Sequence, residues 1–448
     1  MFVRLLVQLG SIPVLWPDSI NYLQTADSIL NFGWIGKHHF YFTPLYPAFL
    51  SIFLSFVPID YASELIVVVQ HIMGLILVCI FYLIARHFLE ARAAFLAALM
   101  LNFNVLLLYY ENVIQTEILF VFLLIITLFF SIHTNKGQPL WRFFVIGILI
   151  GTLCLCRPIA QFLPIVFGIH AALTSKTQAQ RLLRVTAVLG GFSLLLSPWI
   201  IFQWQVFGTP TISLGKGLNL FLRVYEVDKI PIKEDTRFRR LKKIYEETRA
   251  QSNKRYVYFE VRNKIARDLN KRAAAVDDLM FRFALEGLFA YPKRFALKTV
   301  KQIGAYFFGP RESIRFCKSG KREFLCSQRG PALFHWAFFK QGTERSIGAQ
   351  NFLQFFFSYF SFPSYMISIL ALLGIVSVMW KGRVNVDYFL LLMIIGYFAL
   401  VSCLLNVPQD RYRLPIDPIL ILFGVEGVLL LLQRVLKLGR IRQVDLKA

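Results

Sequence analysis

The sequence predicts an all-α polytopic membrane protein with about 10 transmembrane helices and a large helical extracytoplasmic loop. Hydrophobic residues make up 56% of the 448 residues and charged residues only 17%, whereas soluble domains carry about 25% charged residues. The apolar residues cluster in runs of about 20, the length of one helical crossing. The mean hydropathy is +0.56. Together these three observations exclude an ordinary cytosolic enzyme.

The apolar runs predict the membrane spans in order. The short first run, 2–16, contains Arg4 and Gln8 and has no small-residue cleavage site, so we expect a truncated first transmembrane helix rather than a signal peptide. The stretch 143–173 is too long for one crossing, and Arg157-Pro158 interrupts it. Because proline cannot continue the hydrogen-bond ladder, we expect two short helices that meet at this pair. The other expected spans are 65–85, 93–110, 117–132, 183–204, 362–380, 388–407 and 418–432.

The orientation follows from the basic residues of the short loops, which favour the cytoplasmic side. With ten crossings, the short basic loops all fall on one side, together with both termini. Loops longer than about 60 residues translocate regardless of charge, so the long basic segment can lie on the other side. That side also receives 17–64, the turn at 111–116, Arg157-Pro158 and 408–415.

Composition divides the chain into three regions. We expect an N-terminal transmembrane region at 1–204, with the first extracytoplasmic loop at 17–64, and a basic, largely helical extracytoplasmic region at 205–350. The C-terminal helices and a cytoplasmic tail follow at 351–448. The middle region holds 30 Lys and Arg against 14 Asp and Glu. Anionic membrane lipids or glycans account for this charge better than nucleic acid, which an external loop does not meet.

Within the middle region two segments have helical character. In 233–286 apolar residues recur at i, i+3 and i+4 spacing, which is typical of an amphipathic helix. The stretch 291–308 is basic and aromatic, as expected for a helix that lies in the headgroup plane.

Ionisable residues collect at the extracytoplasmic ends of the predicted helices. Charge at membrane depth is costly, so such a group of residues calls for a ligand. A carboxylate can act as a general base for a hydroxyl nucleophile, and guanidinium groups suit a departing phosphate. This combination suggests group transfer from a lipid phosphate at the external membrane surface. The residues are Asp18, Glu117, Arg157, Arg411 and Arg413.

Around these residues the chain resembles GT-C-fold membrane glycosyltransferases, the type that includes protein O-mannosyltransferases and lipid A aminoarabinose transferases. Six motifs carry the resemblance in the same order along most of the chain. They are Asp18-Ser19-x-x-Tyr22, Pro44-Leu45-Tyr46-Pro47, Thr116-Glu117-Ile118-Leu119-Phe120, Arg157-Pro158 with Pro164, Ser197-Pro198-Trp199 with Phe207-Gly208-Thr209-Pro210, and Arg411-Tyr412-Arg413-Leu414-Pro415-x-x-Pro418. Two departures are that the first motif has one acid instead of an acidic pair, and that Phe202-Gln203 replaces an Arg-Asn pair.

The resemblance implies a polyprenyl-phosphate sugar donor and an acceptor hydroxyl on a glycan, lipid or protein. It implies a bacterial plasma-membrane enzyme with its site on the extracytoplasmic face. Asp18 is the expected general base, Glu117 the second catalytic acid, and Arg157, Arg411 and Arg413 the phosphate-binding residues. Tyr22, Lys37 and Tyr412 are candidates for donor or acceptor contact.

We expect neither a metal nor another cofactor, because the arginines can neutralise the phosphate. Asp27 lies nine positions after Asp18, about 180° around a helix, so we leave it out of the base role. A lipid-linked glycan transporter and a catalytically inactive relative remain the alternative functions.

Two cysteines, Cys317 and Cys326, lie in polar sequence, and the other four lie in apolar runs. In an extracytoplasmic loop they are exposed to an oxidising compartment. The intervening residues include Gly320 and are compatible with a tight turn. We therefore predict a disulfide between them.

Overall fold

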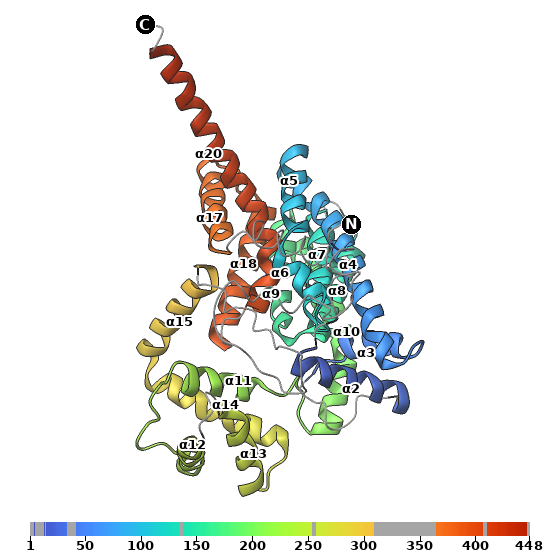
Figure 1. Cartoon of the computed structure of the whole chain (residues 1–448), viewed down its shortest axis with the longest axis vertical. Coiled ribbons are helices and arrows are strands. Elements are labelled where there is room, and N and C mark those ends of the chain that lie inside the picture. The colour runs from blue at the N-terminus through green and yellow to red at the C-terminus, as the bar shows by residue number, and fades with distance from the viewer. Residues whose placement is uncertain are drawn as a thin grey trace, which may run out of the picture.

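The computed structural model describes residues 4, 13, 15–33, 42–133, 138–252, 257–308, 364–405 and 410–445, with the backbone alone at 17, 59–60, 364, 410 and 435–445. All regular elements in these ranges are helical, as predicted. The membrane helices form one body, with a group of shorter helices at one end and the last part of the C-terminal helix projecting at the other (Figure 1). Of the first predicted span, 2–16, the structure describes only Arg4, residue 13 and residues 15–16. Three further predicted residues, Lys37, Cys317 and Cys326, lie outside the described residues, and so does the predicted disulfide.

The segment 17–64, the expected first extracytoplasmic loop, is largely helical. It contains α2 (Pro17–Phe32), α3 (Leu45–Leu54) and the start of α4 (Ile59–Phe88). Pro17 occupies the first position of α2, where its missing N–H costs nothing, and the Trp16 amide donates to Ser19 Oγ at 2.9 Å. Gly33, with φ of 70°, ends the helix in the left-handed conformation that glycine adopts without strain. The helix brings Asp18 to a capped, defined position.

Four described helices are long and apolar enough to cross a membrane, and a bent pair would make a fifth span. The bent pair corrects the prediction of a single span at 93–110, because the chain breaks at Phe103-Asn104 and the two helices differ in direction by 50°. Asn104 caps the second helix by accepting from the Leu107 amide at 3.0 Å, a role for which asparagine is favoured. The four long helices include α4, α10 (Gln178–Phe207), α18 (Val386–Leu405) and α20 (Asp417–Asp445), and the bent pair is α5 (Ala91–Asn102) with α6 (Val105–Glu111).

Shorter apolar helices complete the membrane body. The predicted break at Arg157-Pro158 is confirmed, since one helix ends at Cys156 and a single 3₁₀ turn, η1 (Pro158–Ala160), separates it from the next. The shorter helices are α7 (Glu117–Ile132), α8 (Leu140–Cys156), α9 (Leu163–Leu173) and α17 (Ser364–Trp380).

Glycines allow two pairs of membrane helices to approach closely. A Cβ atom at Gly191 of α10 would lie 2.1 Å from the carbonyl oxygen of Phe144 in α8, and one at Gly147 of α8 would lie 2.1 Å from the carbonyl oxygen of Val188. Helices α17 and α20 meet in the same way at other glycines. Small residues at such contacts are characteristic of helix packing in membranes, where close van der Waals contact replaces the hydrophobic drive.

The middle region forms a second group of helices with a hydrophobic core of its own. Leu218, Phe221, Val261, Met280 and Phe283 belong to this core. The helical character predicted for 233–286 is confirmed. From this group the helix α15 (Pro292–Phe308) runs to α17 and α18 (Figure 1). The other elements are α11 (Lys216–Phe221), the π-helical turn η2 (Leu222–Val227), α12 (Arg239–Gln251), α13 (Tyr258–Asp268) and α14 (Ala273–Ala290).

A buried arginine fastens this second group to the membrane helices. Arg223 of η2 forms an ion pair with Asp228. Its Nε donates to the Cys403 carbonyl of α18 at 3.2 Å, and its Nη2 donates to Thr299 Oγ1 of α15 at 3.3 Å. Burial raises the pKa of Asp228, and the positive charge of Arg223 opposes this shift. One side chain thus joins three elements at the boundary between the two helix groups.

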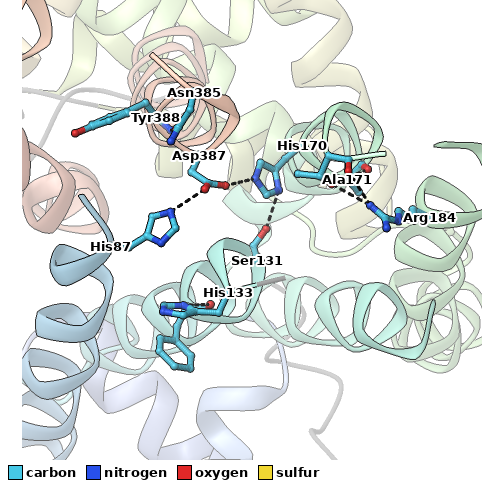
Figure 2. Close-up of polar contacts among 11 residues, drawn as sticks. His87, Ser131, His133, His170, Ala171, Arg184, Asn385, Asp387 and Tyr388 are labelled. Atoms are coloured by element: carbon cyan, nitrogen blue, oxygen red, sulfur yellow. Dashed lines mark hydrogen bonds and ion pairs between the residues drawn. The ribbon is translucent and has the colours of Figure 1, made fainter. Parts of the chain in front are cut away.

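A cluster of histidines lies at the end of α7 opposite to Glu117. Figure 2 shows Asp387 of α18 between two imidazoles, with His87 Nε2 and His170 Nε2 each 2.9 Å from a carboxylate oxygen. Ser131 Oγ of α7 lies 3.1 Å from His170 Nδ1. Glu117 and Ser131 are 14 residues apart on one helix, or about 21 Å at 1.5 Å per residue. The cluster and Glu117 therefore mark the two ends of the membrane body.

The glycine contact between α8 and α10 yields a stability prediction. Gly191→Ala should destabilise the protein by about 1–3 kcal/mol, because the new methyl group forces two backbones apart. Gly190→Ala is the matched control: its Cβ would meet nothing closer than Phe144 Cε2 at 4.0 Å. Thermal unfolding of the detergent-solubilised protein measures both variants. Equal melting temperatures for the two variants would contradict the close contact.

The Arg223 anchor yields a pH-dependent prediction. Arg223→Gln should destabilise the protein by about 3–5 kcal/mol near neutral pH, because Asp228 is left buried without its partner. A buried carboxyl with a raised pKa contributes most when protonated, and this contribution is lost as the pH rises through the folded-state pKa. The defect should therefore be smaller at pH 5 than at pH 8, as measured by thermal unfolding at both values. A defect that does not depend on pH would assign the loss to packing alone.

Candidate active site

Five side chains from distant parts of the sequence form a line of alternating charge. Asp18 pairs with Arg411, and Glu117 pairs with Arg157. The ring of Tyr412 lies between the two arginines, with its centroid 5.0 Å from the Arg411 guanidinium carbon and 5.6 Å from that of Arg157. The structure thus brings together all but one of the predicted ionisable site residues.

Asp18 is the more accessible carboxylate of the two. It occupies the second position of α2, where an acid interacts favourably with the positive end of the helix dipole. Its Oδ2 accepts from Arg411 Nη1 at 3.3 Å, and its side chain keeps 44% of its surface exposed. A long, half-exposed ion pair of this kind can open to admit a ligand.

Arg411 lies in the short helix α19 (Asp410–Arg413), which precedes the 3₁₀ turn η5 (Leu414–Ile416) and α20. Its Nη2 donates to the Tyr412 hydroxyl at 3.2 Å. Its Nε is buried and has no hydrogen-bond partner among the described residues. Arg411 therefore has a donor available for a ligand.

Glu117 and Arg157 form the buried part of the line. Glu117 begins α7 and is 2% exposed, and its Oε1 accepts from Arg157 Nη1 at 2.9 Å. Its Oε2 is buried and has no hydrogen-bond partner in the described part of the chain. Arg157 is in position because α8 ends at Cys156 and Pro158 starts a new turn. The guanidinium carbon also lies 5.7 Å from the centroid of Phe120, a distance at which a cation is attracted to an aromatic ring.

Tyr22 lies one helical turn after Asp18 and belongs to an aromatic cluster. Its ring centroid is 4.5 Å from that of Phe42 and 5.2 Å from that of Tyr46. Burial raises the pKa of Tyr22, and the charges of Asp18 and Glu117 raise it further. The hydroxyl therefore stays protonated at neutral pH and can donate a hydrogen bond.

Arg413, which we predicted to bind phosphate, has partners within the protein. Its Nε donates to Asp417 Oδ1 at 3.0 Å, and its Nη1 donates to the Phe307 carbonyl at 3.0 Å. Asp417 is fully buried and also lies 3.4 Å from Asn104 Nδ2. These contacts favour a structural role, in which Arg413 holds the Arg411-Tyr412 segment to α20 and α15.

Sequence reasoning missed two residues of this region. Asp417 had a usable signal, because it follows Arg413 by four positions, the spacing of neighbours on a helix. Gln115 had no sequence signal. It lies in the turn before Glu117, and its buried amide atoms have no hydrogen-bond partner among the described residues.

Two further buried acids of the membrane helices are paired within the protein. Glu111 is fully buried between Arg4 at 2.7 Å and His71 at 2.8 Å. Glu426 lies 3.4 Å from Lys381 Nζ and 3.6 Å from an Arg383 nitrogen.

The chemistry of the line is that of a base beside an anion site. An exposed carboxylate is placed to accept a proton from a hydroxyl group. Guanidinium groups suit the oxygens of a phosphate, and two of them lie near the same ring. Among the described residues, no group of three or more His, Cys, Asp and Glu has the arrangement to hold a metal ion.

Comparison with solved structures finds similarity to two membrane enzymes. The archaeal oligosaccharyltransferase AglB from Archaeoglobus fulgidus, in complex with an inhibitory peptide and a dolichol-phosphate, is 14% identical with a TM-score of 0.44, over 100% of this chain and 51% of that one. ArnT from Cupriavidus metallidurans, bound to undecaprenyl phosphate, is 13% identical with a TM-score of 0.39, over 95% of this chain and 76% of that one. The chain thus spans about half the length of AglB.

Comparison with curated proteins found no match. A family model does match: residues 42–202 fit that of the dolichyl-phosphate-mannose-protein mannosyltransferases. The matched segment runs from α3 into α10 and contains Glu117, Arg157 and the Pro198-Trp199 pair. Residues 42–202 are therefore similar to the dolichyl-phosphate-mannose-protein mannosyltransferases.

Proposed function

We propose that the chain is a membrane glycosyltransferase that moves a sugar from a polyprenyl-phosphate donor to an acceptor hydroxyl on the extracytoplasmic side. The observation that supports this most is the line Asp18–Arg411–Tyr412–Arg157–Glu117, which places a half-exposed base beside two arginines. The sugar, and whether the acceptor is a glycan, lipid or protein, are left open by this site.

In the proposed reaction the acceptor hydroxyl gives its proton to the Asp18 carboxylate. The acceptor oxygen then bonds to the anomeric carbon of the sugar, and the bond from that carbon to the donor phosphate oxygen breaks. The electron pair stays on the phosphate oxygen, and Arg157 and Arg411 stabilise the polyprenyl phosphate that leaves. Donors aimed at developing charge are commonly the largest contribution to catalysis.

The ion pairs of the site have separate roles in this proposal. Arg411 is only 3.3 Å from Asp18 and partly exposed, so an arriving phosphate can take over Arg411 and free Asp18 as a base. Arg157 stays on the buried Glu117 carboxylate and is held in position for the phosphate. Arg413 holds the segment through Asp417.

We also propose ten crossings and an extracytoplasmic site. Basic residues near the histidine cluster support this orientation, since Arg86 lies in the last turn of α4 beside His87, and Lys381 follows α17 six residues before Asp387. Glu117 begins α7 at the end away from Ser131 and the histidine cluster, and the Tyr412 carbonyl accepts from Tyr306 of α15.

The base assignment predicts the behaviour of an isosteric variant. Asp18→Asn should lower transfer by about 10²–10⁴-fold, the contribution of a positioned general base. Asp27→Asn is the matched control, because Asp27 lies on the opposite side of α2 and contacts Asn31. Transfer is measured in membranes supplied with a radiolabelled polyprenyl-phosphate sugar. Full activity of Asp18→Asn would contradict the assignment.

A double-variant experiment separates binding from folding at the Glu117–Arg157 pair. Arg157→Gln alone should lower stability by about 3–5 kcal/mol, because Glu117 remains buried and unpaired. Adding Glu117→Gln should restore most of the melting temperature. Transfer should stay low in the double variant if Arg157 binds the phosphate. Recovery of transfer along with stability would show that the pair is structural only.

The same preparation tests the alternative functions. A transporter moves the labelled lipid across the bilayer without forming product, and an inactive relative does neither. Labelled acceptor formed by the unmodified chain supports the proposal, and movement of intact donor alone overturns it.

A further inference from the structure

Helix α15 carries an apolar stripe that no described residue covers. Leu297 is 66% exposed and Val300 65% exposed, and Phe308 continues the stripe along the helix. Gly304 lies between them, with nothing within 4 Å of the position of a Cβ atom. The four positions recur at spacings of three and four residues, so they lie on one face of the helix. The opposite face, with Phe295, Thr299 and Tyr306, is buried against the protein.

The exposed face of α15 is also strongly basic. The helix has four cations and no acid in its 17 residues. Lys293, Arg294 and Lys301 are exposed next to the apolar stripe, whereas the charge of Lys298 acts on the buried Asp228. A helix with apolar side chains beside several exposed cations is the form that lies in the headgroup region of an anionic membrane.

The position of α15 fits such a membrane contact. The helix packs against α17 and α18, and Ser368 of α17 donates to its Phe307 carbonyl at 2.7 Å. Helix α17 itself exposes apolar side chains such as Ile369 and Leu372. The two helices in contact, α15 and α17, thus both expose apolar side chains, as expected at a lipid-facing surface.

The last turn of α15 is bonded directly to the candidate active site. The Tyr306 hydroxyl donates to the Tyr412 carbonyl at 2.9 Å, and Arg413 Nη1 donates to the Phe307 carbonyl at 3.0 Å. Tyr412 is the ring between Arg157 and Arg411. A shift of α15 would therefore also shift the segment Arg411–Arg413, because two hydrogen bonds join them.

We propose that α15 is a lipid-docking helix, which binds the anionic headgroups of the membrane surface and thereby holds the Tyr412-Arg413 segment in place. The lipid contact stands by itself; only its effect on turnover rests on the proposed glycosyltransferase function. The apolar stripe enters the interface, the three exposed cations bind phosphate groups, and the docked helix orders the arginine segment.

The test uses the full chain in vesicles of phosphatidylcholine with about one third phosphatidylglycerol, an anionic surface that attracts exposed cations. Electron paramagnetic resonance of spin-labelled phosphatidylglycerol and phosphatidylcholine measures the preference of the protein for the anionic lipid. The variant Lys293→Gln/Arg294→Gln/Lys301→Gln should lower this preference by about twofold or more. The control Arg267→Gln/Lys271→Gln/Arg272→Gln removes the same charge from exposed positions around the end of α13. This control should leave the preference for the anionic lipid unchanged.

The outcomes separate the two proposals. The docking site would be overturned if both triple variants lost the lipid preference equally. It would also be overturned if neither variant lost it. Transfer activity should rise with phosphatidylglycerol in the unmodified chain and the control but not in the α15 variant. An α15 variant that loses the lipid preference and keeps this rise would overturn the coupling, and absence of transfer in every vesicle would overturn the proposed function alone. Size-exclusion elution confirms folding, with Arg294→Gln/Lys301→Gln as the milder variant.

Discussion

The buried ion pair between Glu117 and Arg157 joins the start of α7 to the break between α8 and α9. Charge at this depth is costly unless it is paired, so each residue requires the other. The break at Pro158 is needed because a continuous helix would carry Arg157 along the membrane instead of across to Glu117. Once Arg157 is held there, Tyr412 can pack on it, and Arg411 and Asp18 extend the line to the surface. The order of the candidate site thus depends on one pair.

A second set of contacts links the site to the helices outside the membrane body. Arg223 binds the end of α18 and the middle of α15, and the end of α15 binds the backbone of Tyr412 and the side chain of Arg413. Because these contacts join buried or half-buried groups, the second helix group and the segment Arg411–Arg413 hold one another in position. The basic middle region is therefore part of the machinery that positions the site, in addition to any contact it makes with substrate.

The two ends of the membrane body differ in the kind of charge they hold. One end carries carboxylates paired with arginines, which remain charged at any physiological pH. At the other end, Asp387 lies between His87 and His170 (Figure 2). Imidazoles can donate to a carboxylate while neutral, so this cluster ties α4, α9 and α18 together without a second permanent charge.

The sequence by itself determined the all-helical class, the positions of most apolar helices and the break at Arg157-Pro158, because apolar runs and proline act locally. Tertiary structure alone decided which charges pair: Arg411 with Asp18 joins residues 393 positions apart. It also bent the span at 93–110, where capping by Asn104 outweighed hydropathy. Arg413 is different, because its partner Asp417 follows four positions later, a spacing that a helix brings together. A pairing such as that of Arg411 with Asp18 depends on how the helices pack, and no local pattern encodes it.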